Sequence, residues 1–253
     1  MILRRLIAFA SLLCVGVAVP ACASDIAPAC QDIRYIKTSF TVCKFSAKPS
    51  SIRTFLNDDK GKPYGNFSAL GNALSAKKQT LIFAMNGGMY IDDRSAAGLY
   101  IENGIEVKAL NTKQGPGNFH MMPNGVFYVG KGEAGVLKTD AYALMKLGVK
   151  VRSATQSGPM LVIDGKMHPK FNLESTSIHI RNGVGVDGDM VYFAISNERV
   201  NFHTFASLFK DHLKTPNALY LDGAVSKLYA PELNRNDYGR PMGPMIAVVE
   251  DAQ

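Results

Sequence analysis

Two uninterrupted apolar runs stand out in the hydrophobic pattern of this chain, at residues 81–85 (LIFAM) and 218–221 (ALYL). Runs of this length without polar alternation are typical of strands that are covered on both faces. Each run is followed at once by small and polar residues, which are Asn86, Gly87 and Gly88 after the first run and Asp222 and Gly223 after the second. We therefore expect two buried strands whose ends carry polar side chains.

Shorter patterns predict the other elements. Apolar residues at helical spacing behind a capping side chain predict helices from Asn66 or Ser68 to about Ala76, from Thr139 to about Leu147, and from Asn201 or Thr204 to about Leu213. β-Preferring segments bounded by turn residues predict strands at residues 32–45, 98–104, 125–132, 160–163, 190–195 and 245–249. The segment 32–45 is expected at a sheet edge, and the Pro- and Gly-rich loop 231–244 is expected to rim a pocket.

The N-terminus has the pattern of a secretory signal peptide, which we assign to residues 1–23. Arg4 and Arg5 precede the apolar run 6–19, and Ala21-Cys22-Ala23 supplies small residues around a cut before Ser24. An apolar run of about 14 residues is shorter than the roughly 20 that cross a bilayer. We expect a single domain over residues 24–253, periplasmic or secreted, with no membrane span after cleavage. Lipid attachment at Cys22 is the alternative.

Composition narrows the class of protein further. Cleavage removes two of the four cysteines and leaves Cys30 and Cys43, an even pair in an exported chain, for which a disulfide is the natural inference. The five histidines show no metal-ligand spacing, so we expect neither a built-in metal nor a cofactor. The net charge of +7 falls by two, to +5, with the loss of Arg4 and Arg5. The lysines and arginines of the chain are dispersed rather than clustered, which does not indicate nucleic-acid binding.

The two strand ends carry the first candidate chemistry. Asp222 would lie at the mouth of a sheet, and Gly223 would let the backbone approach a ligand. Gly87 and Gly88 leave backbone N–H groups free to point at an anion, beside the amide of Asn86. Ordinary tight turns at both places are the alternative.

Two further positions carry candidate polar groups. Ser157 lacks the Gly-x-Ser-x-Gly elbow of a nucleophile, which favours hydrogen bonding or plain loop structure. Arg181 precedes a glycine-rich strand and offers a two-pronged donor for phosphate or carboxylate, although a surface salt bridge fits equally well. The Gly183, Gly185 and Gly188 spacing matches a dinucleotide fingerprint only formally, because a strand and not a helix follows it.

Taken in order, the segments 86–90 (NGGMY), 157–165 (SGPMLVIDG), 181–186 (RNGVGV) and 221–223 (LDG) resemble the phosphodiester glycosidase family. This family includes the enzyme that removes N-acetylglucosamine from a phosphodiester to expose mannose 6-phosphate. The resemblance extends from about Thr80 to Val249. It implies an α+β fold with a mixed, strongly twisted β-sheet core, a few flanking helices and a central pocket, and it implies cleavage of a sugar–phosphate glycosidic bond.

The resemblance also implies roles for named residues. Asp222 is expected to act as nucleophile or general base and Arg181 to neutralise the phosphate. Glu198 does not match a family motif and is a candidate second carboxylate by its position alone. The remaining substrate- and phosphate-binding candidates are Asn86, Gly87, Gly88, Ser157, Gly158, Gly223 and Ser226.

Two departures from the family pattern leave alternatives open. One is Asn197-Glu198, which stands where family members often carry an Asp-Gly pair, so that one candidate carboxylate is absent and Glu198 lies nearby. Family members often carry Asp-Gly-Gly-Gly-Ser where this chain has Ala224 and Val225 in place of the second and third glycines. The expected protein is an exported glycosidase acting on a carbohydrate phosphate of the envelope or of an extracellular glycan. The altered loop favours the alternative of a non-catalytic binding or assembly protein for envelope polysaccharide. A metal-dependent phosphodiesterase using Asp187, Asp189 and Asp222 is a third possibility.

Overall fold

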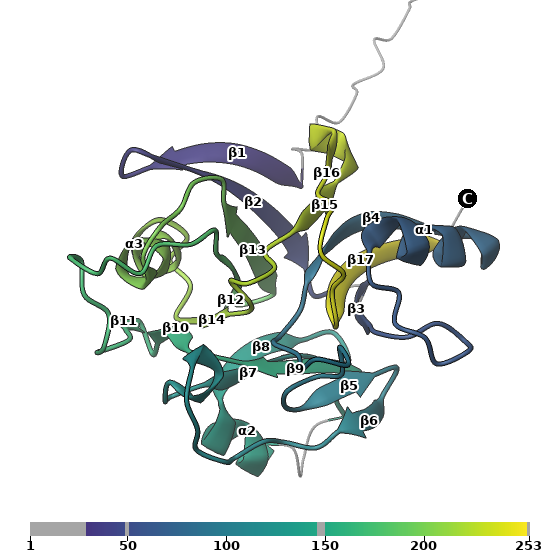
Figure 1. Cartoon of the computed structure of the whole chain (residues 1–253), viewed down its shortest axis with the longest axis horizontal. Coiled ribbons are helices and arrows are strands. Elements are labelled where there is room, and N and C mark those ends of the chain that lie inside the picture. Colours follow the sequence, from purple (N-terminus) through teal and green to yellow (C-terminus); the bar gives the residue numbers. More distant parts are fainter. Residues whose placement is uncertain (1–28, 49–50, 146–149, 252–253) are drawn as a thin grey trace, which may run out of the picture.

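Three antiparallel sheets build the fold, and short helices lie on their outer faces (Figure 1). The computed structural model describes residues 29–48, 51–145 and 150–251. The predicted signal peptide, including Cys22, lies outside the described residues.

The largest sheet, which we call the seven-stranded sheet, has the order β1-β2-β13-β12-β14-β10-β11. Its strands are β1 (Cys30–Tyr35), β2 (Thr38–Ser46), β13 (Met190–Ser196), β12 (Asn182–Asp187), β14 (Asn217–Tyr220), β10 (Met160–Ile163) and β11 (Lys166–Met167). The predicted buried run at residues 218–221 is therefore a central strand, β14, paired on both sides.

Two five-stranded sheets pack beside it. The β4 sheet has the order β16 (Arg235–Asn236), β15 (Leu228–Ala230), β4 (Gln79–Asn86), β17 (Met245–Asp251) and β3 (Ile52–Phe55). The β9 sheet has the order β6 (Ile105–Lys108), β5 (Tyr100–Glu102), β9 (Ser153–Ser157), β7 (Gly125–Val129) and β8 (Ala134–Lys138). The apolar run at residues 81–85 forms most of β4, as expected.

The predicted helices begin at their capping residues. Asn66 caps α1 (Phe67–Ala76) by accepting a hydrogen bond from the backbone N–H of Ala69, and Asn201 caps α3 (Phe202–Ser207) in the same way through Thr204. A π-helical turn (Leu208–His212) extends α3. Helix α2 (Thr139–Met145) begins at the predicted Thr139, and its predicted end lies outside the described residues. Short 3-10 turns occupy Asn118–His120 and Pro231–Leu233.

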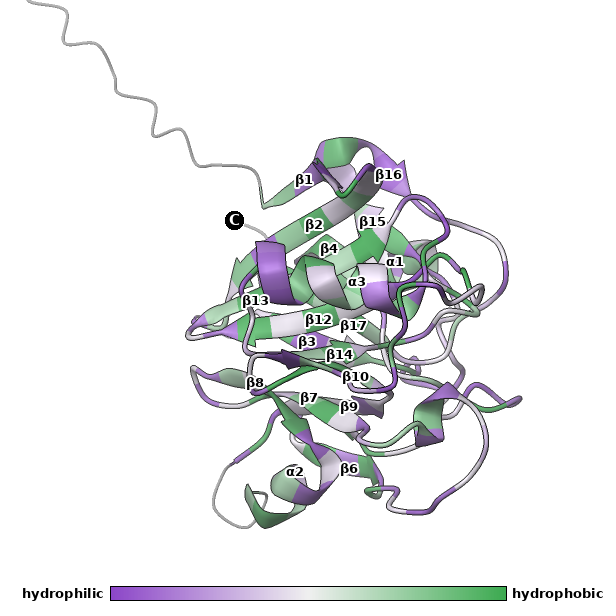
Figure 2. Cartoon of the chain, turned by 90° about the vertical axis from the view of Figure 1, so that its left-hand side faces the viewer, coloured by the Kyte–Doolittle hydropathy of each residue, from purple (hydrophilic) through white to green (hydrophobic). Residues whose placement is uncertain are grey.

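Aromatic side chains join the three sheets in one core. Phe193 of the seven-stranded sheet lies 4.9 Å from Phe83 of the β4 sheet and 5.9 Å from Phe127 of the β9 sheet, measured between ring centroids. All three rings are buried. Figure 2 shows the strands stacked against one another, with hydrophobic residues recurring along them. The sheets therefore share a core, and their ends meet in a common region.

The predicted disulfide and the predicted edge position of the N-terminal strands are both confirmed. Cys30 and Cys43 are direct partners across β1 and β2 and form a disulfide, and β1 is an edge strand of its sheet. The α+β class with a twisted sheet core and a few helices is also confirmed. None of the helices in the described ranges has the length and apolar character needed to span a bilayer.

Candidate active site

Asp222 follows β14 and lines a pocket of about 540 Å³. The residue is 8% exposed, and burial raises the pKa of its carboxyl group. The backbone N–H of Ala224 donates to Asp222 Oδ1 at 2.9 Å, which lowers this pKa by less than burial raises it. A largely desolvated carboxylate beside a cavity is a suitable group for nucleophilic or general-base chemistry.

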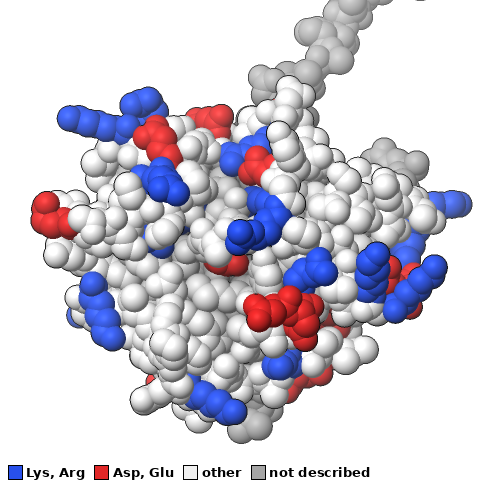
Figure 3. Space-filling view, in the orientation of Figure 1, with Lys and Arg blue, Asp and Glu red and all other residues white. Residues whose placement is uncertain are grey.

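Two arginines line the same pocket, Arg94 and Arg240. Neither guanidinium has a hydrogen-bond or ion-pair partner among the described side chains, so both are available to an anion. Burial raises the pKa of Tyr90, which also lines the pocket; Asp222 raises it further, while Arg240 and Arg94 lower it. Figure 3 shows basic and acidic side chains close together near the centre of this face. The pocket thus combines one buried carboxylate with two unpaired cations.

The altered loop after Asp222 still closes around the carboxylate. Ala224 keeps the backbone hydrogen bond to Asp222, and the side chain of Val225 packs into the cluster that contains Phe67 and Met242. Ser226 Oγ lies 2.7 Å from the carbonyl oxygen of Asp222 and turns toward the backbone. With Ala224 and Val225 in place of the two glycines of the family pattern, Asp222 still lines the pocket. Ser226 supports the loop through its hydrogen bond to the backbone.

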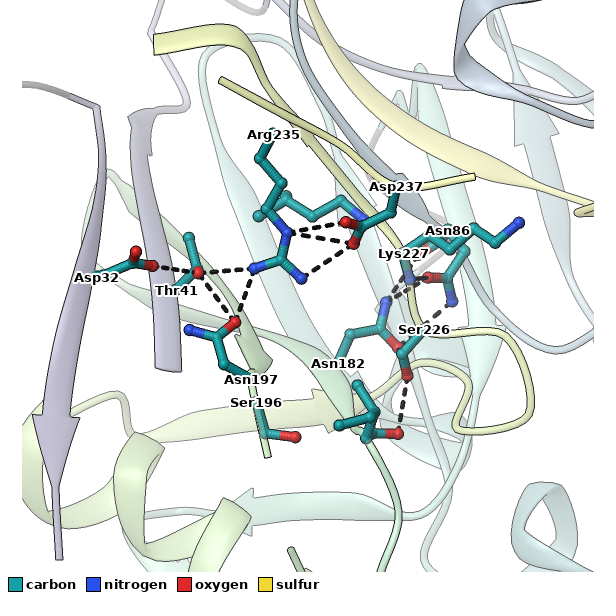
Figure 4. A network of polar contacts seen from close by, with 12 residues as sticks. Asp32, Thr41, Asn86, Asn182, Ser196, Asn197, Ser226, Lys227, Arg235 and Asp237 are labelled. Atoms are coloured by element: carbon teal, nitrogen blue, oxygen red, sulfur yellow. Dashed lines mark hydrogen bonds and ion pairs between the residues drawn. The ribbon is translucent and has the colours of Figure 1, made fainter. Parts of the chain in front are cut away.

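A buried amide pair holds this strand end in place (Figure 4). Asn182, the first residue of β12, and Asn86, the last of β4, exchange hydrogen bonds through their side chains, the shorter of 2.9 Å. Asn182 Oδ1 also accepts the backbone N–H of Asp222 at 3.1 Å. Asn86 therefore lies behind Asp222 and fixes it through Asn182, in place of the predicted contact with substrate.

The other two predicted loops also support the site from behind. Ser157 is fully buried, and its hydroxyl donates to the carbonyl oxygen of Leu221 at 2.5 Å. The N–H groups of Gly87 and Gly88 are taken by the carbonyl oxygen of Pro244 and the hydroxyl of Thr155. The predicted anion cradle at these glycines is therefore occupied by protein acceptors.

Gly158 packs too tightly against its neighbours to leave space for a ligand. A Cβ at this position would lie 2.7 Å from Asn124 Cβ and 2.7 Å from the carbonyl oxygen of Phe119. The role of Gly158 is thus close packing at the end of β9.

Arg181 does not line the pocket, which corrects the predicted phosphate contact. The residue is completely buried, its guanidinium lies 3.6 Å from the centroid of the Phe202 ring, and Nε and Nη2 donate to the carbonyl oxygens of Val200 and Ser177. Burial lowers its pKa. Arginine can satisfy carbonyls of two separate loops with its rigid fork, so this side chain joins the loops on either side of β12 and β13.

Glu198 is also remote from the pocket walls. Its side chain is exposed, and Oε1 accepts the backbone N–H of Ser39 at 3.3 Å. We assign this residue no catalytic role. The carboxylate of Asp92 lines the pocket with Asp222 and is the better placed second acid.

The three aspartates of the metal hypothesis are not brought together. Asp187 lies at the end of β12 opposite to Asn182, about 17 Å away along an extended strand, whereas Asp222 bonds to Asn182 itself. Asp189 pairs with Lys48 at 2.9 Å on the surface. Within the described ranges, no three His, Cys, Asp or Glu side chains converge as a metal site requires.

The model of the phosphodiester glycosidase family matches residues 79–249, more than half of the chain. The chain belongs to the phosphodiester glycosidase family. The uncharacterized protein YigE of Escherichia coli strain K12 is 36% identical over 207 residues, which cover 80% of each chain.

Two solved structures resemble this phosphodiester glycosidase fold. One is the zebrafish N-acetylglucosamine-1-phosphodiester alpha-N-acetylglucosaminidase catalytic domain, auto-inhibited by its pro-peptide, with a TM-score of 0.62 and 14% identity over 88% of this chain and 84% of that one. The other is a Burkholderia pseudomallei protein described as exported, with a TM-score of 0.50 and 10% identity over 83% of this chain and 74% of that one. At these identities the likeness is one of fold.

Sequence reasoning missed the pocket arginines of this family member. Arg94 and Arg240 stand in polar loops without any motif around them. The one available signal was the Pro- and Gly-rich loop 231–244, whose predicted place at a pocket rim is confirmed because Arg240 and Pro241 line the cavity. Asn182 was also missed, although it belongs to one of the segments that carry the family resemblance.

Proposed function

We propose that this protein is an exported hydrolase that cleaves a sugar-1-phosphodiester linkage in a cell-envelope or extracellular glycan. Membership of the phosphodiester glycosidase family supports a glycosidase-type reaction. The observation that carries the proposal is the pairing, in one pocket, of buried Asp222 with the unpaired guanidinium groups of Arg94 and Arg240.

The chemistry of the linkage explains this combination. A glycosyl phosphodiester breaks through an oxocarbenium-like state, from which a phosphate monoester departs readily, so protonation of the leaving group matters less than for an ordinary glycoside. Asp222 attacks the anomeric carbon or activates water there, and its desolvated position strengthens its interaction with developing positive charge. Arg94 and Arg240 balance the charge of the phosphate.

Export is supported by two independent features. The N-terminal sequence has the charged, apolar and small-residue order of a signal peptide. The Cys30–Cys43 disulfide fits an oxidising compartment. An exported glycosidase of this type meets its phosphodiester substrates outside the cytoplasm, in the periplasm or beyond the cell.

The direct test is turnover of a sugar-1-phosphodiester by wild type and Asp222→Asn. We expect release of reducing sugar by the wild type and a loss of at least about 100-fold in kcat/KM for the variant, because the amide can neither attack nor accept a proton. Asp164→Asn is the matched control, since Asp164 is exposed and its positive φ of 49° suits asparagine. This control is expected to retain wild-type turnover.

Two outcomes would contradict the proposal in different ways. Full turnover by Asp222→Asn would remove the assigned role of the carboxylate. Tight binding of the glycan phosphate by the wild type without any released sugar would favour the alternative of a non-catalytic binding or assembly protein for envelope polysaccharide.

A further inference from the structure

Residues 237–242, which we call the rim loop, include Arg240 and are held by hydrogen bonds at both ends and at Arg240. At its start, Asp237 and Leu228 exchange hydrogen bonds of 3.0 Å through the Asp237 backbone N–H and carboxylate. Near its end, the hydroxyl of Tyr90 donates to the carbonyl oxygen of Pro241 at 3.1 Å, and the N–H of Met242 donates to the carbonyl oxygen of Gly65 at 2.8 Å. The loop is therefore built to hold one conformation.

A buried lysine supplies the contact in the middle of the rim loop. Lys227 is only 6% exposed, and its ammonium Nζ donates to the carbonyl oxygen of Arg240 at 2.6 Å. Its backbone N–H donates to Asn86 Oδ1 at 2.8 Å, which joins the lysine to the amide pair behind Asp222. Lys227 thus contacts the amide pair behind Asp222 through its backbone and the residue that carries the pocket cation through its side chain.

The position of this lysine is costly for the fold. Burial lowers the pKa of Lys227, and the nearby carboxylate of Asp237 only partly offsets this effect. An apolar side chain of similar length would fill the space without the desolvation cost of an ammonium group. What an apolar side chain cannot provide is a charge-assisted hydrogen bond to the backbone of Arg240.

We propose that Lys227 is a positioning residue that places Arg240 for phosphate binding. It fixes the Arg240 backbone and thereby limits the positions of the guanidinium in the pocket that Asp222 also lines. The inference rests on the proposed function in so far as the anion gripped by Arg240 is the phosphate of a glycosyl phosphodiester.

The test is a double-mutant cycle on ligand binding, read by calorimetry with N-acetylglucosamine 1-phosphate as the probe. Arg240→Ala is expected to weaken binding about tenfold, and Lys227→Met about fivefold to tenfold. Because the lysine acts through the arginine, the double variant is expected to bind no more weakly than Arg240→Ala alone. Lys227→Arg, which keeps a charged donor, is expected to bind more tightly than Lys227→Met.

A matched control and a folding check separate positioning from stability. Lys131→Met removes one positive charge from an exposed position and is expected to bind like the wild type. Thermal unfolding of every variant reports folding, and Lys227→Gln replaces Lys227→Met in the cycle if the latter does not fold.

Additive losses in the cycle, wild-type binding by Lys227→Met, or absence of probe binding by the wild type would each overturn the assignment. Hydrolysis bears on the proposed function separately. Non-additive losses of binding without any hydrolysis would support the positioning role of Lys227 and contradict the proposed reaction. Hydrolysis together with additive losses of binding would support the reaction and contradict the positioning role.

Discussion

The hydroxyl of Tyr220 occupies the space that a Cβ atom at position 223 would need. A Cβ at position 223 would lie 1.7 Å from the Tyr220 hydroxyl oxygen and 3.0 Å from its Cζ. Tyr220 is buried next to Arg181, whose guanidinium lies 5.4 Å from the centroid of its ring. Glycine at position 223 therefore leaves room for the hydroxyl group of the buried Tyr220. The sequence suggested a different reason for this glycine, which was the approach of the backbone to a ligand.

This contact predicts a specific suppressor. Gly223→Ala should lower the free energy of unfolding by about 1–3 kcal/mol, the usual effect of an overpacked site, and should reduce turnover because Asp222 shifts. Removing the hydroxyl as well, in Tyr220→Phe/Gly223→Ala, should restore part of the loss, since the nearest remaining atom is 3.0 Å away. Urea unfolding measures both variants.

Gly71→Ala is the control for this experiment. Its new Cβ would have ordinary contact with Leu81 at 3.8 Å, and alanine favours the surrounding helix α1. Equal destabilisation by Gly71→Ala and Gly223→Ala, or no recovery in the double variant, would contradict the proposed clash.

Strand ends from all three sheets meet beneath Asp222. Asn182 of the seven-stranded sheet bonds to Asn86 of the β4 sheet, the Ser157 hydroxyl of the β9 sheet bonds to the carbonyl oxygen of Leu221, and Gly88 bonds to Thr155. These buried polar contacts satisfy strand ends that would otherwise be unpaired. Asn86, Ser157 and Asn182, which belong to the polar segments noted in the sequence, therefore join the sheets behind the carboxylate and do not line the pocket themselves.

The edge of the seven-stranded sheet is held covalently by Cys30–Cys43. Replacing both cysteines with serine should lower the free energy of unfolding by about 3 kcal/mol, because the disulfide closes a short loop of chain in the unfolded state. Urea denaturation under oxidising conditions measures this difference.

Reductant provides the internal control for the disulfide. It should destabilise the wild type to a similar extent and leave the Cys30→Ser/Cys43→Ser variant unchanged. A variant as stable as the oxidised wild type would show that the edge strands need no covalent support.

Burial of the ionised Asp222 carboxylate beside the pocket lowers the free energy of unfolding of the protein. Burial raises the pKa of Asp222 above its ordinary value of 3.8, so the folded state holds this proton more tightly than the unfolded state does. As pH rises, the unfolded carboxyl ionises first. The wild type therefore loses stability between the ordinary pKa and the raised one, and it bears the full cost above both.

Asp222→Asn should remove this cost while it abolishes turnover. We expect the variant to be more stable than the wild type in urea at pH 7, and the advantage to disappear below about pH 3.8, where both states hold the proton. Asp164→Asn makes the same chemical change at an exposed position and is the control. A variant less stable than the wild type at pH 7 would mean that the ionised carboxylate contributes net favourable contacts.

Local features of the fold were predictable from the sequence. Asn66 and Asn201 cap helices where expected, β4 and β14 follow their apolar runs, and Cys30 pairs with Cys43. Each of these features depends on neighbouring residues, or on two cysteines with no competitor, so a linear pattern contains enough information. The position of Asp222 at a strand end belongs to the same group.

The direction in which each polar side chain faces depended on the tertiary structure. The chain by itself determined its family, its strands and the aspartate at the end of β14. Only packing between distant segments decided that Arg181 points into the core, that Glu198 lies on the outside, and that Arg94 and Arg240 face the pocket. A loop side chain takes the side that its neighbours leave open, and those neighbours come from other sheets, so no local pattern records the outcome.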